Sequence, residues 1–137
     1  MPLLANSTDG AVTRKRLEAW AAKEEKVTVV AATDAATIQS AATLAGARRV
    51  VYTMTPTTGR ALTTPTGAEL GAAFTDEVAG SSFEVTVVNL ASATHAITFT
   101  AGASGVTIVG VATVAAASSA TFVGVFTAAD TVSFYRE

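Results

Sequence analysis

The second half of the chain, residues 81–137, alternates apolar and polar positions along several short runs. In the first run, Phe83, Val85 and Val87 share one parity, and polar residues separate them. This period of two is typical of half-buried strands, and β-branched and aromatic residues pack well on a pleated surface. Ser, Gly, Ala and Asp interrupt the runs at intervals of about ten residues, which is typical of an antiparallel sandwich or barrel.

The first half of the chain adds further strands and one short helical turn. Thr66 and Glu69 match a capping box, so we expect a helical turn over residues 66–74. We expect a weak strand or loop over residues 37–42. The β region is expected to start at residues 26–32, with a firmer strand at residues 48–55 and another short strand at residues 60–64. With the strands of the second half, the total is about eight, the number in a two-sheet jelly roll.

One stretch near the start has the period of a helix. Between residues 13 and 25, Leu17, Trp20 and Ala21 recur at helical spacing and form an apolar side. The basic residues of this stretch come first and its acidic residues last, which opposes the helix macrodipole. A helix of this length with that defect is marginal alone, so we expect it to dock through Leu17 and Trp20.

The period changes from 3.6 to 2 after Lys26, and this change predicts the domain organisation. Residues 1–25 are predicted to form an N-terminal arm and a short amphipathic helix. Residues 26–137 are predicted to form a β-sandwich domain. The predicted fold class is therefore mostly β, an antiparallel jelly-roll-like β-sandwich with an N-terminal arm and short helix.

Composition limits the classes of partner. The formal net charge of -2 argues against nucleic acid or an anionic membrane as the main partner. Only 15% of the 137 residues are charged, against about 25% in an average soluble domain. Interfaces between subunits are depleted of charge at their centres, so we expect a homo-oligomer, specifically a homotrimer. The chain has no cysteine, which excludes disulfides, thiolate metal sites and a cysteine nucleophile.

No group of residues predicts catalysis or metal binding. His95 is the single histidine, and neither Asp76 nor Asp130 forms a recognisable local motif with it. We therefore expect His95 to be an exposed or edge residue. The acids of residues 75–77 and Asp130 lack the spacing of a calcium loop. The chain is predicted not to be an enzyme and to need no cofactor.

Two other local patterns have a structural and a functional interpretation. Gly102, Gly105 and Gly110 resemble a loose nucleotide motif, but no helix follows them, so they are predicted to be turn and bulge glycines. The basic residues 14–16 form either a solvated helix face or a contact to an acidic protein surface.

Four stretches together resemble a known class of virion proteins. They are GRALTTPTGAEL (59–70), GSSFEVTVVNLASATHAITFTAGASGVTIVG (80–110), SSATFVGVF (118–126) and TVSFYRE (131–137). The chain is similar here to the β domain of capsid decoration (cement) proteins of tailed bacteriophages and related small head or tail modules. The resemblance implies a jelly-roll-like sandwich, trimerisation, and attachment to the major capsid protein on the exterior of the virion.

The arm and helix lie outside this resemblance and are predicted to make the capsid contact. The residues expected to contribute are Leu3, Leu4, Arg14, Arg16, Leu17 and Trp20. A fibre or tail adhesin domain that contacts carbohydrate or a receptor is the alternative. Sugar platforms use exposed aromatic side chains, and the single tryptophan lies in the predicted helix. A small enzyme is the least favoured class.

Overall fold

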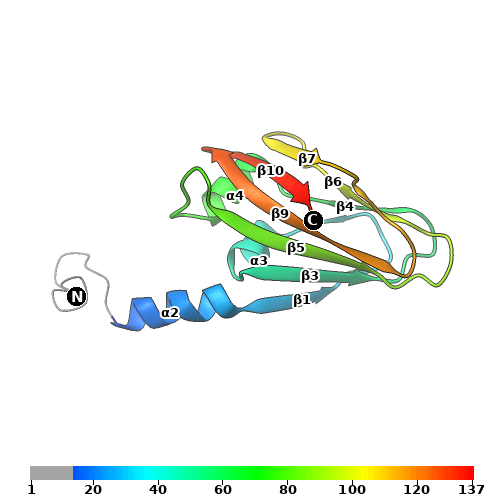
Figure 1. The fold of residues 1–137 in the computed structure, drawn as a ribbon, viewed down its shortest axis with the longest axis horizontal. Coiled ribbons are helices and arrows are strands. Elements are labelled where there is room, and N and C mark those ends of the chain that lie inside the picture. The colour runs from blue at the N-terminus through cyan, green and yellow to red at the C-terminus, as the bar shows by residue number, and fades with distance from the viewer. Residues whose placement is uncertain (1–13) are drawn as a thin grey trace.

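The computed structural model describes residues 14–137, which form three helices and ten strands (Figure 1). The helices are α2 (Arg14–Glu25), α3 (Ala41–Ala45) and α4 (Gly67–Ala73). The strands are β1 (Val27–Ala31), β2 (Thr37–Ile38), β3 (Arg49–Met54), β4 (Arg60–Thr63), β5 (Ser82–Asn89), β6 (Ile97–Thr100), β7 (Val106–Val109), β8 (Thr113–Val114), β9 (Ser118–Ala128) and β10 (Thr131–Arg136). The predicted mostly-β class is confirmed, whereas the predicted arm lies outside the described residues.

The strands form two mixed sheets. The larger has the order β1-β3-β5-β9-β10-β7, and the smaller has the order β2-β4-β6-β8. The prediction of antiparallel sheets is wrong, because five of the eight strand pairs are parallel. The chain alternates between the sheets from β1 to β9, so each strand returns to its own sheet after a crossover and can pair in parallel. This mixed order does not confirm the jelly-roll connectivity.

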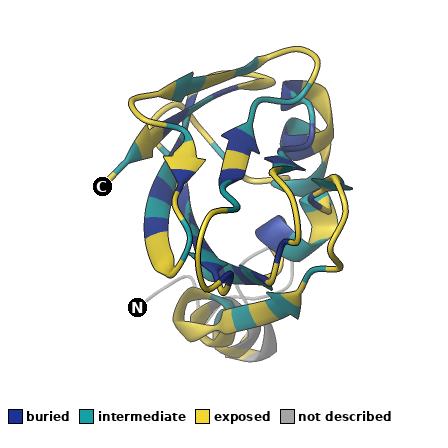
Figure 2. Cartoon of the chain, turned by 90° about the vertical axis from the view of Figure 1, so that its right-hand side faces the viewer, coloured by how far each residue is buried: buried dark blue, intermediate teal, exposed yellow. Residues whose placement is uncertain are grey.

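The hydrophobic core lies between the two sheets (Figure 2). Phe99 of β6 stacks on Phe122 of β9 with ring centroids 4.2 Å apart, which joins the small sheet to the large one. Phe134 of β10 makes edge contacts with Phe99 at 5.2 Å and with Phe83 of β5 at 5.5 Å. Alternate residues of β3 and β5 are buried, as the period of two predicts.

The short helices follow from their capping residues. The Thr66 hydroxyl accepts a hydrogen bond from the Glu69 N–H at 3.2 Å, and the Glu69 carboxylate accepts one from the Thr66 N–H at 2.8 Å. The predicted capping box is confirmed, and the hydrogen bond from the Thr66 backbone lowers the pKa of Glu69. The sequence analysis missed α3, which Ser40 caps and Gly46 ends, because five residues are too few to show a helical period.

Helix α2 leads directly into the first strand. The helix ends at Glu25 and β1 begins at Val27. Figure 1 shows α2 continuing beyond the end of β1, away from the two sheets. Its length agrees with the helix predicted over residues 13–25.

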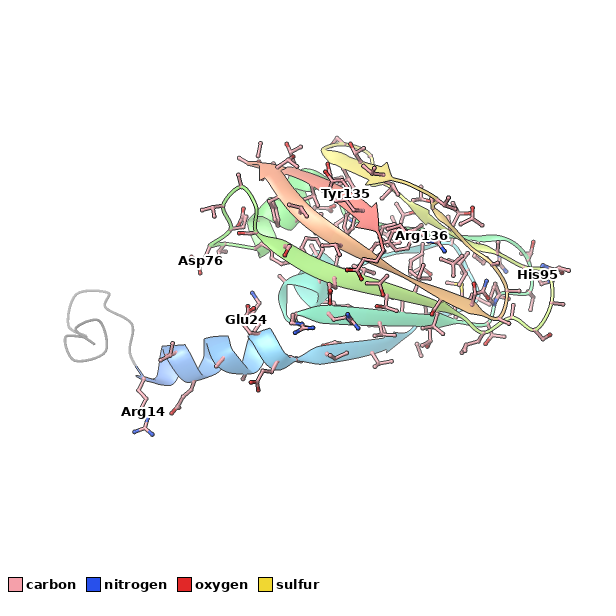
Figure 3. All side chains as sticks on the ribbon, viewed as in Figure 1. Arg14, Glu24, Asp76, His95, Tyr135 and Arg136 are labelled. Atoms are coloured by element: carbon pink, nitrogen blue, oxygen red, sulfur yellow. The ribbon has the colours of Figure 1, made fainter. Side chains whose placement is uncertain are left out.

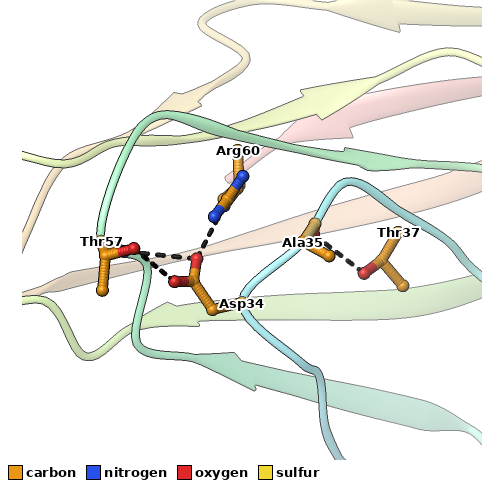
Figure 4. Close-up of polar contacts among 5 residues, drawn as sticks. All are labelled: Asp34, Ala35, Thr37, Thr57 and Arg60. Carbon is orange, nitrogen blue, oxygen red and sulfur yellow. Dashed lines mark hydrogen bonds and ion pairs between the residues drawn. The ribbon is translucent and has the colours of Figure 1, made fainter.

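An ion pair joins the loop after β1 to the start of β4 (Figure 4). The Asp34 carboxylate accepts hydrogen bonds from Arg60 Nε at 2.6 Å and from the Thr57 hydroxyl at 2.5 Å. The Thr57 N–H also donates to this carboxylate at 3.2 Å. The hydrogen bond from Arg60, followed by that from Thr57, lowers the pKa of Asp34.

This lowered pKa predicts a dependence of stability on pH. A depressed folded-state pKa contributes stability above the unfolded value of about 3.9 and loses it as pH falls toward the folded value. Asp34→Asn is therefore expected to lower Tm by a constant amount from pH 8 to about 5, with the difference narrowing below about pH 4. Calorimetry of both proteins across this range measures the effect. A Tm difference between the two proteins that stays equally large at the lowest pH would contradict the lowered pKa of Asp34.

Candidate interaction surface

The predicted contact residues fall partly on α2. Arg14 is exposed and its Nε lies 3.0 Å from Glu18 Oε1, one helical turn along. Leu17 is half-buried. Arg16 and Trp20 also belong to α2, but their side chains lie outside the described part of the structure. Leu3 and Leu4 precede the described residues.

The last turn of α2 contacts the β domain. The Lys23 ammonium lies 5.6 Å from the ring centroid of Phe74, which follows α4, within the range of a cation–π contact. An open cleft of about 430 Å³ separates this turn of α2 from the segment between α4 and β5. Charged side chains of both signs line it, including Glu24, Arg48 and Asp76. Lys23 of the last turn thus contacts the domain, and Figure 1 shows the helix axis running away from the two sheets toward its first turn.

The candidate catalytic residues lie far apart. Figure 3 places His95 at one end of the molecule and Asp76 at the opposite end, so these two residues form no dyad. Asp130 packs against Gly67 and Gly71 of α4, in the half of the molecule remote from His95. The His95 carbonyl accepts a hydrogen bond from the buried Asn89 amide at 2.8 Å, which gives the loop between β5 and β6 a structural contact.

Residues 14–137 contain no cluster of three His, Cys, Asp or Glu residues that could hold a metal ion. Among the helices of this part of the chain, none is long and apolar enough to cross a membrane. The glycines of the loose nucleotide motif have a conformational role in the backbone, as predicted. Gly105 and Gly110 have φ values of 70° and 97°, and a Cβ at Gly102 would lie 2.4 Å from the Pro65 carbonyl oxygen.

The outer face of the six-stranded sheet carries few charged residues among those that the structure describes. Valine and threonine predominate on it, and all its residues are exposed or half-buried. Arg49 and Glu84 form an ion pair on this face, in which Arg49 Nη2 lies 2.8 Å from Glu84 Oε2. We refer to this surface as the outer sheet face, and its residues are Val27, Val29, Ala31, Arg49, Val51, Thr53, Ser82, Glu84, Thr86, Val88, Ser119, Thr121, Val123, Val125, Ser133, Tyr135, Thr107 and Val109.

Strand β1 forms one edge of this face. Val27 is 54% exposed and Val29 is 66% exposed, although both are valines within a strand. The five residues of β1 include no charge and no proline, the usual devices that protect an edge from pairing. The sequence analysis placed a strand here but did not identify it as an edge. The uncharged run VTVVA is the signal that was available.

No protein-family model, curated protein or solved structure matches the chain. The resemblance to decoration proteins therefore rests on the four stretches quoted above.

Proposed function

We propose that this chain is a virion structural protein, a capsid decoration (cement) protein that binds the outer surface of a phage head. The observation that carries the proposal is the placement of α2. This helix stands away from a rigid two-sheet body and contacts it through its last turn, where Lys23 lies over Phe74. A helix placed in this way can present its first turns to another protein.

A decoration protein acts by thermodynamic linkage. It binds the assembled shell but not the dissociated subunits, and it stabilises the shell by RT ln(1 + [L]/Kd). This amounts to about 2.7 kcal/mol per site when the free protein is at a hundred times its Kd. Several weak contacts on one oligomeric body bind as a unit, with effective concentrations in the millimolar range. A homo-oligomer of two or three copies would act in this manner.

The proposed activity is binding and not catalysis. The separation of His95 from Asp76 supports this choice. A fibre or tail adhesin domain is the alternative function. Within the described residues, Tyr135 is the aromatic side chain that is largely exposed, at 43%, whereas a sugar platform uses aromatic rings as its main contact. The contact surface on α2 is therefore the better supported proposal.

Deleting residues 1–25 is expected to abolish attachment to capsids and to leave the β domain folded, because β1 begins at Val27. Trp20→Ala alone is expected to weaken attachment by about 2–4 kcal/mol per subunit, the range of a buried interface anchor. The measurement is co-sedimentation with undecorated capsids assembled from the major capsid protein of the same genome, followed by heating to compare the temperatures at which the shells dissociate.

Tyr135→Ala is the matched control, since it removes an exposed aromatic side chain from the β domain and leaves α2 intact. It is expected to sediment with capsids as the unmodified protein does. If the truncated protein still saturates and protects the shell, the capsid contact lies on the sheets and this proposal is wrong.

A further inference from the structure

Within residues 14–137 no strand pairs with the edge of β1 that faces away from β3, and the backbone groups along this edge are regularly arranged. The Lys26 carbonyl accepts a hydrogen bond from the Arg48 N–H at 3.0 Å, and the Ala32 N–H donates to the Thr53 carbonyl at 2.8 Å. Both residues therefore turn their backbone groups toward β3. Because successive residues of a parallel ladder alternate in direction, the intervening odd-numbered residues of β1 turn theirs away from β3. The N–H and C=O groups of Val27, Val29 and Ala31 thus point to the open edge.

The same three residues carry the exposed side chains of β1. The exposure along the strand alternates, with Val27, Val29 and Ala31 exposed and the two residues between them half-buried. Figures 1 and 2 show α2 beyond the end of β1 and no other described element along its free side. The edge therefore presents unpaired hydrogen-bonding groups and apolar side chains from one set of residues.

This arrangement is complementary to itself. If an identical strand runs antiparallel with Val29 opposite its own copy, Val27 lies opposite Ala31 of the second copy, and Ala31 opposite Val27. Each such pair can exchange two backbone hydrogen bonds, so three pairs give about six. Residues directly opposite in an antiparallel pair share a face, so the two outer sheet faces join without inversion.

We propose that a second copy of this chain pairs with the β1 edge about a two-fold axis at Val29, forming one continuous sheet across two subunits. The contact is isologous, since the same strand supplies both halves. It removes from water the backbone groups of an edge that has no charge or proline to protect it. The inference concerns contact between copies and does not rest on the proposed capsid binding.

The opposite edge of the sheet, β7, is less suited to such pairing. The Val132 N–H donates to the Gly105 carbonyl at 2.9 Å, so the odd-numbered residues of this segment face β10. The backbone groups left at the open edge belong to Val106 and Ile108, whose side chains pack against the core. The β7 edge therefore has open backbone groups on two residues, whereas the β1 edge has them on three. The side chains of Val106 and Ile108 also face the core and not the outer sheet face.

Pairing β1 with β7 of a neighbour is the arrangement that could join three copies through these edges. Such a contact is heterologous, and it must either close into a ring of eighteen strands, three sheets of six, or continue as an open chain. The self-pairing of β1 closes with two copies. It therefore predicts a two-fold assembly, in place of the three-fold one that composition suggests.

A disulfide tests the two-fold axis directly, because the chain has no cysteine of its own. The Cα atoms of a hydrogen-bonded antiparallel pair are about 5.5 Å apart, and disulfides join Cα atoms about 4.4–6.8 Å apart. Val29→Cys is therefore expected to give a covalent dimer under mild oxidation, seen on a non-reducing gel. Val27→Cys is the matched control, since the two-fold axis separates its two copies by about 13 Å along the strands.

The mass in solution, measured by light scattering coupled to size exclusion, is the second readout. The unmodified protein is expected at twice the 13.8 kDa chain mass. Val29→Lys places two like charges opposite each other and is expected to weaken dimerisation at least tenfold. The side chain is 66% exposed, so the variant should fold. Val109→Lys makes the same change at the β7 edge and is expected to leave the dimer intact.

Three results would overturn the proposal. The first is a monomer up to about 100 µM, where a micromolar Kd would already be saturated. The second is an oligomer that Val29→Lys leaves unchanged while Val29→Cys gives no cross-link. The third is loss of assembly in Val109→Lys as well as Val29→Lys, which would indicate pairing of β1 with β7. None of these results bears on capsid binding through α2, so the two proposals can fail separately.

Discussion

Replacing Gly67 with alanine is expected to destabilise the protein by about 3 kcal/mol. A Cβ at this position would lie 2.0 Å from the Asp130 carbonyl oxygen and 2.7 Å from the Gly105 carbonyl oxygen. Both are backbone atoms, so no side chain can rotate to make room. The first turn of α4 would have to separate from the turn between β9 and β10. Alanine favours a helix over glycine by up to about 1 kcal/mol, so a loss of stability would identify the close contact as its cause.

Urea unfolding of matched glycine variants measures this effect. Gly59→Ala is the control, because a Cβ there would meet no atom within 4 Å. It is expected to stay within about 0.5 kcal/mol of the unmodified protein. Gly71→Ala should fall between the two, since the nearest atom is Oδ1 of the Asp130 side chain, which can move. If Gly67→Ala were as stable as Gly59→Ala, the packing of α4 described here would be wrong.

Phe134→Ala is the second substitution with a large expected effect, a loss of about 3–5 kcal/mol. The ring is fully buried and makes edge contacts with Phe83 and Phe99, so it packs against both sheets. Removing it leaves a cavity between the layers and loses aromatic contacts of about 0.5–1.5 kcal/mol each. A domain of this kind is stable by about 5–15 kcal/mol in total, so the variant would lose a large share of its stability.

The neighbouring residue provides the control. Tyr135 belongs to the same strand but points to the outer sheet face, where it is 43% exposed. Tyr135→Ala is expected to change the free energy of unfolding by less than about 1 kcal/mol. Thermal unfolding of the two variants side by side compares an inward with an outward aromatic ring. Equal losses would show that the assignment of faces in β10 is wrong.

Several elements could be predicted because local chemistry decides them. The alternation of Phe83, Val85 and Val87 predicted the buried side of β5, and the structure confirms it. Thr66 and Glu69 predicted α4 through the hydrogen bonds of a capping box. Helix α2 was predicted from the spacing of its apolar residues. In each instance the signal lies within a few residues of the element that it predicts.

The strand order could not be predicted in this way. Alternation shows which side chains of a strand face the core, but it does not show which strand lies beside it. Both β3 and β5 show the same alternation, and their parallel pairing depends on crossovers through the smaller sheet. The same limit applies to the interaction surface. The uncharged run of β1 predicts a strand, and only the assembled sheet shows that this strand lies at an edge.

The direct connection between α2 and β1 has a mechanical consequence. A single residue, Lys26, separates the helix from the strand, and neither glycine nor proline interrupts residues 14–31. A pull on α2 is therefore transmitted along the axis of β1. It loads the five residue pairs between β1 and β3 in shear, so that their hydrogen bonds resist together. A sideways pull would break the same bonds one after another. A protein held by α2 would thus meet tension in the direction in which its first ladder is strongest.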